Sequence, residues 1–407
     1  MDQSVAPEVD IIKALSADPV ERYAAFDDLR AQCPVHKMPN GKTYMALGYD
    51  AVATGLRSVS SFGGSAAQDG LAEEDTTIAG ILEPRHLQIR RIINQVVSVH
   101  RSQQIEAYLE TFIGGLAKEL TAGILERGAP VEVMEHFVQP IPPAAMARLM
   151  GFPEADSAQY YGWGSQLGVN IGRAAAAGES LSLRDACPEM ASYVEGRIVE
   201  RQALPDEQWP NDALTRFLRT DVEGERLSVR SIVIQIMFAI GAGSDTTRNT
   251  LGSLLWRLAQ APDTYARICA DRTLVEPAIE EALRIDSPAQ FMVRRCLAPS
   301  FDLEGTALHE GESVFLSIGS ANRDPQKYQD PMSYDLDRER LRDHLAFGNG
   351  PHTCPGATLA RTEMQIALNV WCDTFESFSL PADFRWTDPG TGMLHGPDQL
   401  PLHLVPR

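Results

Sequence analysis

The sequence predicts a mostly α-helical protein with small β-sheets. Segments whose apolar residues recur with the helical period cover most of the 407 residues, whereas strand-like runs are short and few. No repeat of fixed period, low-complexity linker or shift in composition marks a boundary, which favours one domain over residues 1–407. Helices are expected at about residues 20–31, 86–127, 142–150, 188–202, 228–260, 274–285 and 356–375.

The expected strands are bounded by glycine, proline and aspartate turn signals. They are KTYMALG near the N-terminus, FMVRRCL and ESVFLS between Gln290 and Ser317, and PLHLV near the C-terminus. Two further stretches, residues 61–80 and 172–185, carry small and acidic residues without a clear period and are expected to be irregular. Each is equally consistent with a lid and with an ordinary surface loop.

The charge balance and the cysteine spacing exclude several classes of protein. The formal net charge of −19 disfavours nucleic acid or an anionic membrane as the main partner. The longest uncharged run, Ser231 to Ser244, is too short and too interrupted to span a bilayer, and no leader is visible, so a cytoplasmic protein is expected. The six cysteines lack CxxC spacing, which indicates neither a disulfide framework nor a structural zinc site.

Cys354 lies in LAFGNGPHTCPGATLAR, between a glycine-rich bend and a helix. Gly348 and Gly350 let the backbone bend closely around something, and the pattern after Pro355 is helical. The sulfur would face the N–H groups and the positive dipole end of that helix, which stabilise a thiolate. A thiolate in this setting is a nucleophile or a metal ligand, and the alternative is a buried, inert thiol.

The 228–260 helix is apolar almost all round, which places it in the protein interior. Its centre, GAGSDTT at 241–247, holds two glycines, the carboxyl of Asp245 and the hydroxyl of Thr246. Such residues are costly in a buried helix. They indicate either a kink that serves packing or a local opening, at which an acid and an alcohol relay protons to something bound in the groove.

A third group of residues indicates structural chemistry. Glu281 and Arg284 are three positions apart on one helix face, where they can pair. Arg338 follows two Asp-Pro turns in SANRDPQKYQDPMSYDLDR. A cluster of these three side chains would brace a long loop.

Taken together, these motifs resemble the cytochrome P450 superfamily. They follow the family's order and spacing, and the likeness runs over essentially the whole chain. It is of the soluble bacterial type and is nearest to the camphor and terpenoid hydroxylases. The matching motifs are AGSDTT (242–247), EALR (281–284), YDLDR (334–338) and FGNGPHTCPG (347–356).

The resemblance implies the triangular, mostly helical P450 fold. Haem b (iron protoporphyrin IX) would lie between the 228–260 helix and the Cys loop and helix at 354–375. Cys354 would be the proximal thiolate that binds the haem iron. The close approach of the backbone to the sulfur would tune its electron donation.

The resemblance also implies roles for matching residues. Thr246 would hydrogen-bond dioxygen or its water, and Asp245 would belong to the proton path. The residues expected to hold the haem or its propionates are His86, Arg90, Arg295, Phe347, His352, Cys354 and Gly356. The residues expected at the substrate pocket are Ile78, Val169, Gly241, Ala242, Phe291, Val293 and Met393.

These expectations define a haem-thiolate monooxygenase that hydroxylates a small hydrophobic substrate, terpenoid or aromatic, with O2. The resemblance to the camphor branch implies a tyrosine in the loop before the 86–90 motif, where it would anchor the camphor ketone. Residues 61–82 contain no tyrosine, which argues against camphor itself. Electrons would come from a 2Fe–2S or similar ferredoxin and its NAD(P)H-dependent reductase, with Arg101, Arg342 and Arg361 as candidate docking residues on the Cys354 side. The alternatives are a haem-containing binding or sensor protein without turnover, and a P450 enzyme that performs epoxidation or ring coupling.

Overall fold

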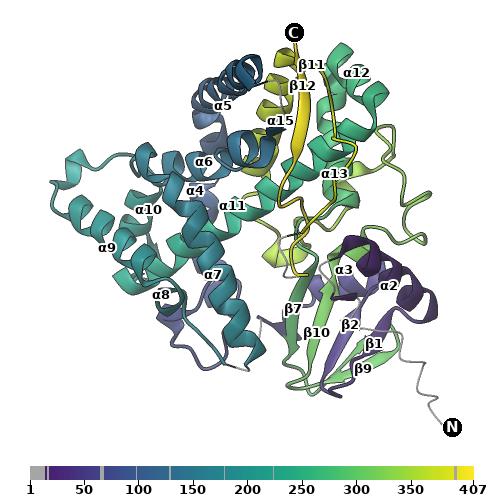
Figure 1. The fold of residues 1–407 in the computed structure, drawn as a ribbon. Coiled ribbons are helices and arrows are strands. Elements are labelled where there is room, and N and C mark those ends of the chain that lie inside the picture. The colour runs from purple at the N-terminus through teal and green to yellow at the C-terminus, as the bar shows by residue number, and fades with distance from the viewer. Residues whose placement is uncertain are drawn as a thin grey trace. The chain divides into compact units, whose positions relative to one another are not determined.

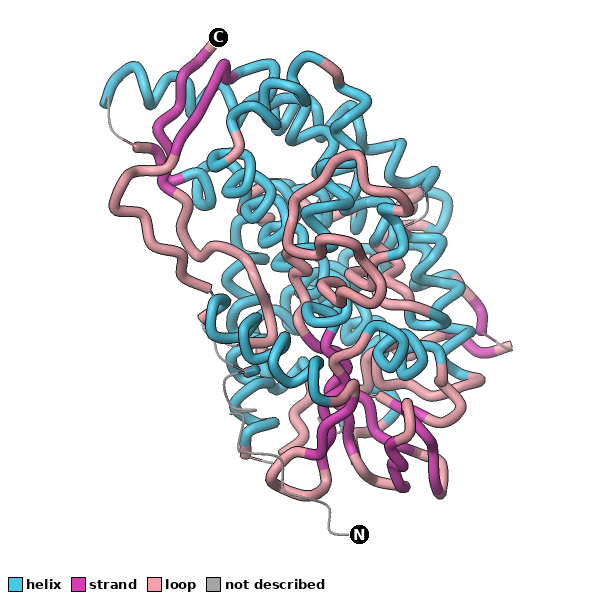
Figure 2. Tube along the Cα trace, turned by 90° about the vertical axis from the view of Figure 1, so that its right-hand side faces the viewer, coloured by secondary structure: helices cyan, strands magenta, loops and turns pink. Residues whose placement is uncertain are grey.

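The computed structural model describes residues 14–15, 18–64, 68–97, 99–127, 130–177, 179–222, 224–388 and 392–407. Helices dominate these residues and the strands form small sheets, as the colours of Figure 2 show. The predicted fold class is therefore confirmed. None of the described helices is both long and apolar enough to cross a lipid bilayer.

The chain divides into two compact units, and each unit joins segments that lie far apart in the sequence. Helix α11 (Val229–Gln260) begins in unit 2 and ends in unit 1. Unit 1 comprises Met1–Gly63, Asn249–Thr353 and Phe378–His403, and unit 2 comprises Gly64–Arg248, Cys354–Ser377 and Leu404–Arg407.

Unit 1 contains a five-stranded sheet in the order β1-β2-β10-β7-β3 (Figure 1). Strand β10 (Ser313–Ser317) runs parallel to β2 (Thr43–Ala46) and antiparallel to β7 (Phe291–Cys296). Val314 and Leu316 point to one face of β10 and are fully buried in the core of this unit. The other strands of unit 1 are β1 (Val35–Lys37), β3 (Phe62–Gly63), and the hairpin of β8 (Ser300–Leu303) and β9 (Thr306–His309).

Helix α13 (Val275–Ile285) carries the brace expected from the sequence. Glu281 and Arg284 are fully buried, and Arg284 Nη2 lies 2.7 Å from Glu281 Oε1. Arg338 Nε donates to the same oxygen at 2.9 Å. Because Arg284 Nη1 also donates to the carbonyl oxygen of Asn322 at 2.8 Å, the brace fixes the 322–338 loop against α13. The other helices of unit 1 are α2 (Pro19–Gln32), α3 (Tyr49–Arg57), α12 (Pro262–Ala270) and α14 (Ile318–Ala321), with 3-10 turns η6 (Arg272–Leu274), η7 (Leu341–Asp343) and η8 (Gly350–His352).

Unit 2 is almost entirely helical, and α5 packs against α15. Its helices are α4 (Arg85–Val96), α5 (Val99–Arg127), α6 (Ile141–Met150), α7 (Ala158–Ala176), α8 (Leu183–Ala186), α9 (Pro188–Gln202), α10 (Ala213–Arg219) and α15 (Ala357–Thr374). Its short turns are η2 (Glu73–Asp75), η3 (Met134–Val138), η4 (Glu154–Asp156) and η5 (Asp206–Gln208). The remaining strands are β11 (Phe375–Ser379), β12 (Pro401–Pro406) and β4 (Val131–Glu132), which form one sheet, and the hairpin of β5 (Asp221–Val222) and β6 (Glu225–Arg226).

Two predictions of secondary structure need correction. The segment 86–127, expected as one helix, is divided into α4 and α5. The division follows the β-branched pair Val96 and Val97, which weakens helical propensity. The stretch 172–185, expected to be irregular, begins inside α7 and ends in α8, since its run of alanines at 174–177 favours helix.

Glu363 is fully buried in α15, and among the described residues none donates a hydrogen bond to its Oε2. Burial raises the pKa of this carboxyl to about 8, from 4.5. The folded protein therefore keeps a proton on Glu363 that the unfolded chain releases as the pH rises above about 4.5. Since the unfolded state then binds fewer protons, the free energy of unfolding falls between pH 4.5 and pH 8.

We expect the Glu363→Gln variant to lack this fall, because glutamine stays neutral over the whole range. The loss of stability from pH 5 to pH 8 should become smaller by an amount on the order of a few kcal/mol. The unfolding midpoint Tm, measured at both pH values, checks this, with Glu119→Gln on the exposed side of α5 as the control. Parallel losses of Tm in wild type and Glu363→Gln would show that the carboxyl is not held neutral.

Candidate functional site

The backbone before Cys354 needs glycine at two positions. Gly348 and Gly350 have φ angles of 74° and 77°, in the left-handed region that other residues rarely adopt. A Cβ atom on Gly350 would also lie only 3.0 Å from the Cα atom of Arg57. The sequence FGNGPHTCPG therefore encodes a tight bend, including the turn η8, that ends directly before the cysteine.

Cys354 is exposed to solvent, although protein atoms surround most of its thiol. Burial raises the pKa of this thiol. The backbone N–H groups of Gly356 and Ala357 and the positive charges of Arg90 and Arg361 act in the opposite direction and lower it. This set of donors and cations favours a negative charge on the sulfur once a metal ion is bound to it.

Two of the expected haem-binding residues lie on α4, in the same unit as Cys354. His86 is buried, and its Nδ1 lies 2.8 Å from Glu83 Oε1, which holds the imidazole ring in place. Arg90 is four positions further along and therefore on the same helix face. Burial lowers the pKa of Arg90, and the nearby Cys354 raises it. A partly buried guanidinium beside the cysteine fits the propionates of a haem.

Helix α11 differs from expectation at its centre. The helix is continuous, so the predicted local opening is wrong. Instead, Thr246 Oγ1 donates to the carbonyl oxygen of Ala242 at 3.0 Å. The glycines lie beside neighbouring helices: a Cβ atom on Gly243 would lie 3.4 Å from Met146 Sδ of α6, and one on Gly241 would lie 3.6 Å from a leucine of α7. Both distances are ordinary van der Waals contacts, so the two helices pack closely against α11 at these positions.

The exposure of α11 marks the part that faces a ligand. The helix is buried over residues 231–237 and 247–251, whereas Ala242 is exposed and Asp245 and Thr246 are half-buried between them. Ala242 and Thr246 are one helical turn apart and therefore share a face. Burial raises the pKa of Asp245, and the charge of Arg248 lowers it. An accessible strip in a buried helix, with a carboxyl that retains its proton more readily than usual, fits a haem and a proton path.

The other expected haem contacts lie in unit 1. Arg295 is on β7 opposite Ser313 of β10, and His352 ends η8. The ring of Phe347 lies 6.0 Å from that of His344. Sequence reasoning overlooked the neighbouring Arg294, which is buried and whose pKa burial lowers. The two consecutive arginines in FMVRRCL could have indicated it. Because neighbouring residues of a strand point to opposite faces, one of the two side chains had to point to the other face of the sheet.

The expected pocket residues differ widely in exposure. Ile78 is buried in unit 2, whereas Val169 on α7 is 51% exposed. Phe291 is buried in the core of unit 1, where its ring contacts Phe26 edge to face at 5.7 Å. In the same unit, Val293 is half-buried. Met393 lies in a loop, and its carbonyl oxygen accepts a hydrogen bond from Gln290 N at 2.9 Å.

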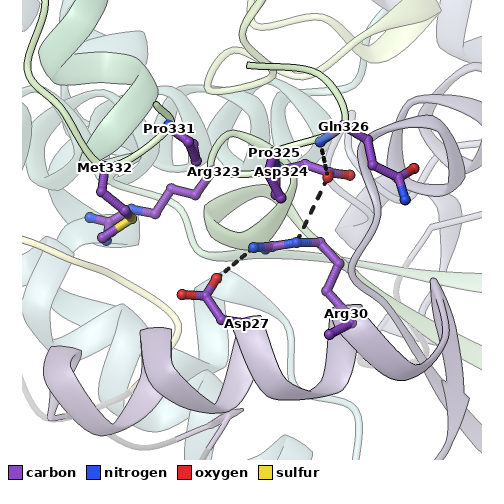
Figure 3. A pocket seen from close by; sticks show the side chains of 9 residues that line it. Asp27, Arg30, Arg323, Asp324, Pro325, Gln326, Pro331 and Met332 are labelled. Atoms are coloured by element: carbon purple, nitrogen blue, oxygen red, sulfur yellow. Dashed lines mark hydrogen bonds and ion pairs between the residues drawn. The ribbon is translucent and has the colours of Figure 1, made fainter. Parts of the chain in front are cut away.

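A separate pocket of about 230 Å³ lies in unit 1 beside α2 (Figure 3). Arg30 crosses it and pairs with Asp27 at 2.5 Å and with Asp324 at 3.8 Å. Arg323, also in its lining, donates to the carbonyl oxygen of Ile285 at 2.7 Å. Because both guanidinium groups already have internal partners, this pocket is a polar contact region of the fold. Among the described residues, no cluster of histidine, cysteine, aspartate and glutamate forms a metal site.

Comparisons with known proteins agree with this geometry. The cytochrome P450 family model matches residues 181–399. The chain is 29% identical over 401 residues to the cytochrome P450 monooxygenase PikC of Streptomyces venezuelae, covering 95% of this chain and 91% of PikC. It is 28% identical over 338 residues to a vitamin D3 dihydroxylase of Streptomyces griseolus, covering 82% of this chain and 79% of that protein.

A solved structure shows the same fold. A mutant of P450 EryK, a protein of S. erythraea, in complex with erythromycin B superposes with a TM-score of 0.84 at 22% identity, over 95% of this chain and 97% of that chain. The match to the family model covers more than half of this chain. The protein belongs to the cytochrome P450 family of oxidoreductases, monooxygenases whose cofactor is haem b.

Proposed function

We propose that the chain, as a single domain over residues 1–407, is a haem-thiolate monooxygenase that inserts one oxygen atom of O2 into a C–H bond of a hydrophobic substrate. The setting of Cys354 carries this proposal. Its sulfur is accessible, lies at the start of α15 and receives the field of two backbone N–H groups and two arginines. Bound haem supplies an iron at which dioxygen is activated, with the thiolate as a strong electron donor.

The haem would lie between α11 and the Cys354 loop with α15. Cys354 would ligate the iron, and the backbone N–H of Gly356 would lie beside the sulfur, where it lowers the pKa of the thiol. His86 and Arg90 would hold propionate groups from α4. Arg295, Phe347 and His352 complete the proposed haem-binding set, in agreement with the family motif that contains two of them.

Asp245 and Thr246 would deliver protons on the distal side. The raised pKa of Asp245 lets its carboxyl hold a proton and pass it on. The hydroxyl of Thr246, which donates to the carbonyl oxygen of Ala242 in this structure, could rotate to donate a hydrogen bond toward the distal side while its oxygen accepts one. A binding or sensor protein without turnover has no need of this pair, which favours the enzyme over that alternative.

A terpenoid or aromatic molecule remains the proposed substrate. The expected pocket residues are mostly apolar, and an apolar pocket binds a hydrophobic molecule and excludes water. The relative named vitamin D3 dihydroxylase supports a hydrophobic substrate in the same family. The name of the same relative, a dihydroxylase, is also the reason that hydroxylation is proposed over epoxidation or ring coupling. The cytoplasmic location expected from the sequence stays a prediction.

The Thr246→Ala variant tests the proposed proton delivery. We expect it to bind haem and substrate as wild type does, because the alanine side chain is smaller and fits the same space, while the hydroxyl and one methyl group are lost. Reducing equivalents should then be released as hydrogen peroxide, and product formed per NAD(P)H should fall several-fold or more. Product and peroxide measured against NAD(P)H consumption check this. An unchanged product yield would contradict the role of Thr246.

Electrons would come from a 2Fe–2S or similar ferredoxin with its NAD(P)H-dependent reductase. Of the candidate docking residues, Arg342 is 62% exposed and lies 2.5 Å from Glu276, and Arg361 acts on the Cys354 thiol. The side chain of Arg101 lies outside the described residues. Local cations of this kind would be needed, because the protein carries a net charge of −19 and small ferredoxins are generally acidic.

Charge reversal tests the docking proposal. Arg342→Glu should slow electron transfer from an acidic ferredoxin several-fold at low ionic strength, and the difference should shrink as salt is added. Stopped-flow reduction in the presence of carbon monoxide measures this rate. Reversal of the exposed Arg226 serves as the control. Equal rates and equal salt dependence in wild type and Arg342→Glu would remove Arg342 from the docking surface.

A further inference from the structure

The segment Gln68–Gly80 is part of the 61–80 stretch that the sequence left open as a lid or an ordinary loop. In the structure it is held firmly within unit 2. Gln68 folds the segment on itself, because its Oε1 accepts from Thr77 N at 2.9 Å and its Nε2 donates to Thr77 Oγ1 at 3.0 Å. Gly80 packs against the same side chain, where a Cβ atom would lie 2.6 Å from Gln68 Oε1. These contacts within the segment fold it compactly, independently of its contacts with the helices.

Gln235 of α11 joins this segment to the long helix. Its side chain is completely buried. Its Oε1 accepts from Ile78 N at 2.9 Å, and its Nε2 donates to the carbonyl oxygen of Thr76 at 3.0 Å. The oxygen and the nitrogen of one side-chain amide thus each pair with a backbone group, one on either side of Thr77. The buried amide therefore leaves neither of these atoms without a hydrogen bond, and it fixes residues 76–78 against α11.

Arg230 forms a second contact from the same helix. Its Nε and Nη2 lie 2.6 and 2.7 Å from the two carboxylate oxygens of Asp75, in a bidentate pair. Asp75 is buried, and Arg230 is about half-exposed. A bidentate pair fixes orientation as well as distance. The segment is consequently attached to α11 at three of the four positions from 75 to 78, namely Asp75, Thr76 and Ile78.

We propose that Gln235 and Arg230 are positioning residues that set the substrate specificity of the enzyme by fixing Ile78 as a rigid wall of the substrate pocket. This inference rests on the proposed function. Ile78 is bonded through its own N–H to the helix that also carries Gly241, Ala242 and Thr246, so the wall and the distal residues share one support. A wall held in this way favours substrates of one shape and gives little room to adapt to larger ones.

Amide hydrogen exchange tests the anchor itself, in the haem-loaded protein. Gln235→Met keeps the side-chain length and removes both hydrogen bonds, and we expect exchange over residues 68–80 to become about tenfold faster or more. Gln235→Glu, which retains an acceptor for Ile78 N–H, should fall between the two. Arg230→Gln is the second, half-exposed variant. Arg201→Met is the matched control, because it breaks an equally close pair with Asp212 at 2.7 Å elsewhere in unit 2.

Ligand size discrimination tests the effect on the pocket. Imidazole and the larger 4-phenylimidazole are titrated against each variant, with the optical shift of the haem as the signal. We expect Gln235→Met to change the ratio of the two Kd values about fivefold or more while the Kd of imidazole stays within about twofold. The Arg201→Met control should keep the wild-type ratio.

Three outcomes overturn the proposal. Unchanged exchange over residues 68–80 in Gln235→Met and Arg230→Gln shows that these contacts do not anchor the segment. Faster exchange with an unchanged Kd ratio shows an anchor that does not shape the pocket. An equal change in Arg201→Met shows a general loss of stability. Failure of the proposed function is distinct, since a wild-type protein without a haem-thiolate spectrum would give no azole shift while its exchange could still be measured.

Discussion

The proposed role of Cys354 sets the constraint on which this account of the structure depends: a sulfur inside a folded helical protein that would bind a metal and carry a negative charge. Cys354 meets it through backbone geometry. Two glycines with positive φ bring the chain to the cysteine, and α15 begins immediately after it with N–H groups directed at the sulfur. Burial alone would favour the neutral thiol, so the N–H groups and the two nearby arginines are the features that oppose it.

The same requirement explains the unusual character of α11. In the proposed site, one face of α11 would contact a planar cofactor, while its other faces pack against neighbouring helices. Gly241 and Gly243 meet α7 and α6, while Ala242 is the exposed position between them. Thr246 and Asp245 add polar groups to the accessible face without breaking the helix. The glycines therefore lie at contacts with neighbouring helices, whereas the polar residues lie on the accessible face, although the two groups are adjacent in the sequence.

Local patterns were sufficient to predict the helical class, the bend at Cys354 and the pair of Glu281 and Arg284, because glycine spacing and charge spacing act over a few residues. Arg338 lies 57 residues from Glu281, and its place in the brace was expected from the order of the motifs along the chain. They were insufficient where a distant partner decides the structure. The position of Ile78 depends on Gln235, 157 residues away, and nothing near Ile78 signals that partner. The local opening in α11 was wrongly predicted for a related reason. The glycines lie against Met146 and other side chains of neighbouring helices, and nothing near them in the sequence signals those contacts.

The most direct test of the account is the optical spectrum of the dithionite-reduced protein after addition of carbon monoxide. The account predicts a Soret band shifted to the red, as thiolate-ligated haem gives, and the loss of this band in Cys354→Ser. A band at the shorter wavelength of haem with a neutral ligand in the native wild-type protein would contradict it. In that case Cys354 would not act as a thiolate ligand, and the proposed oxygen chemistry would lose its basis.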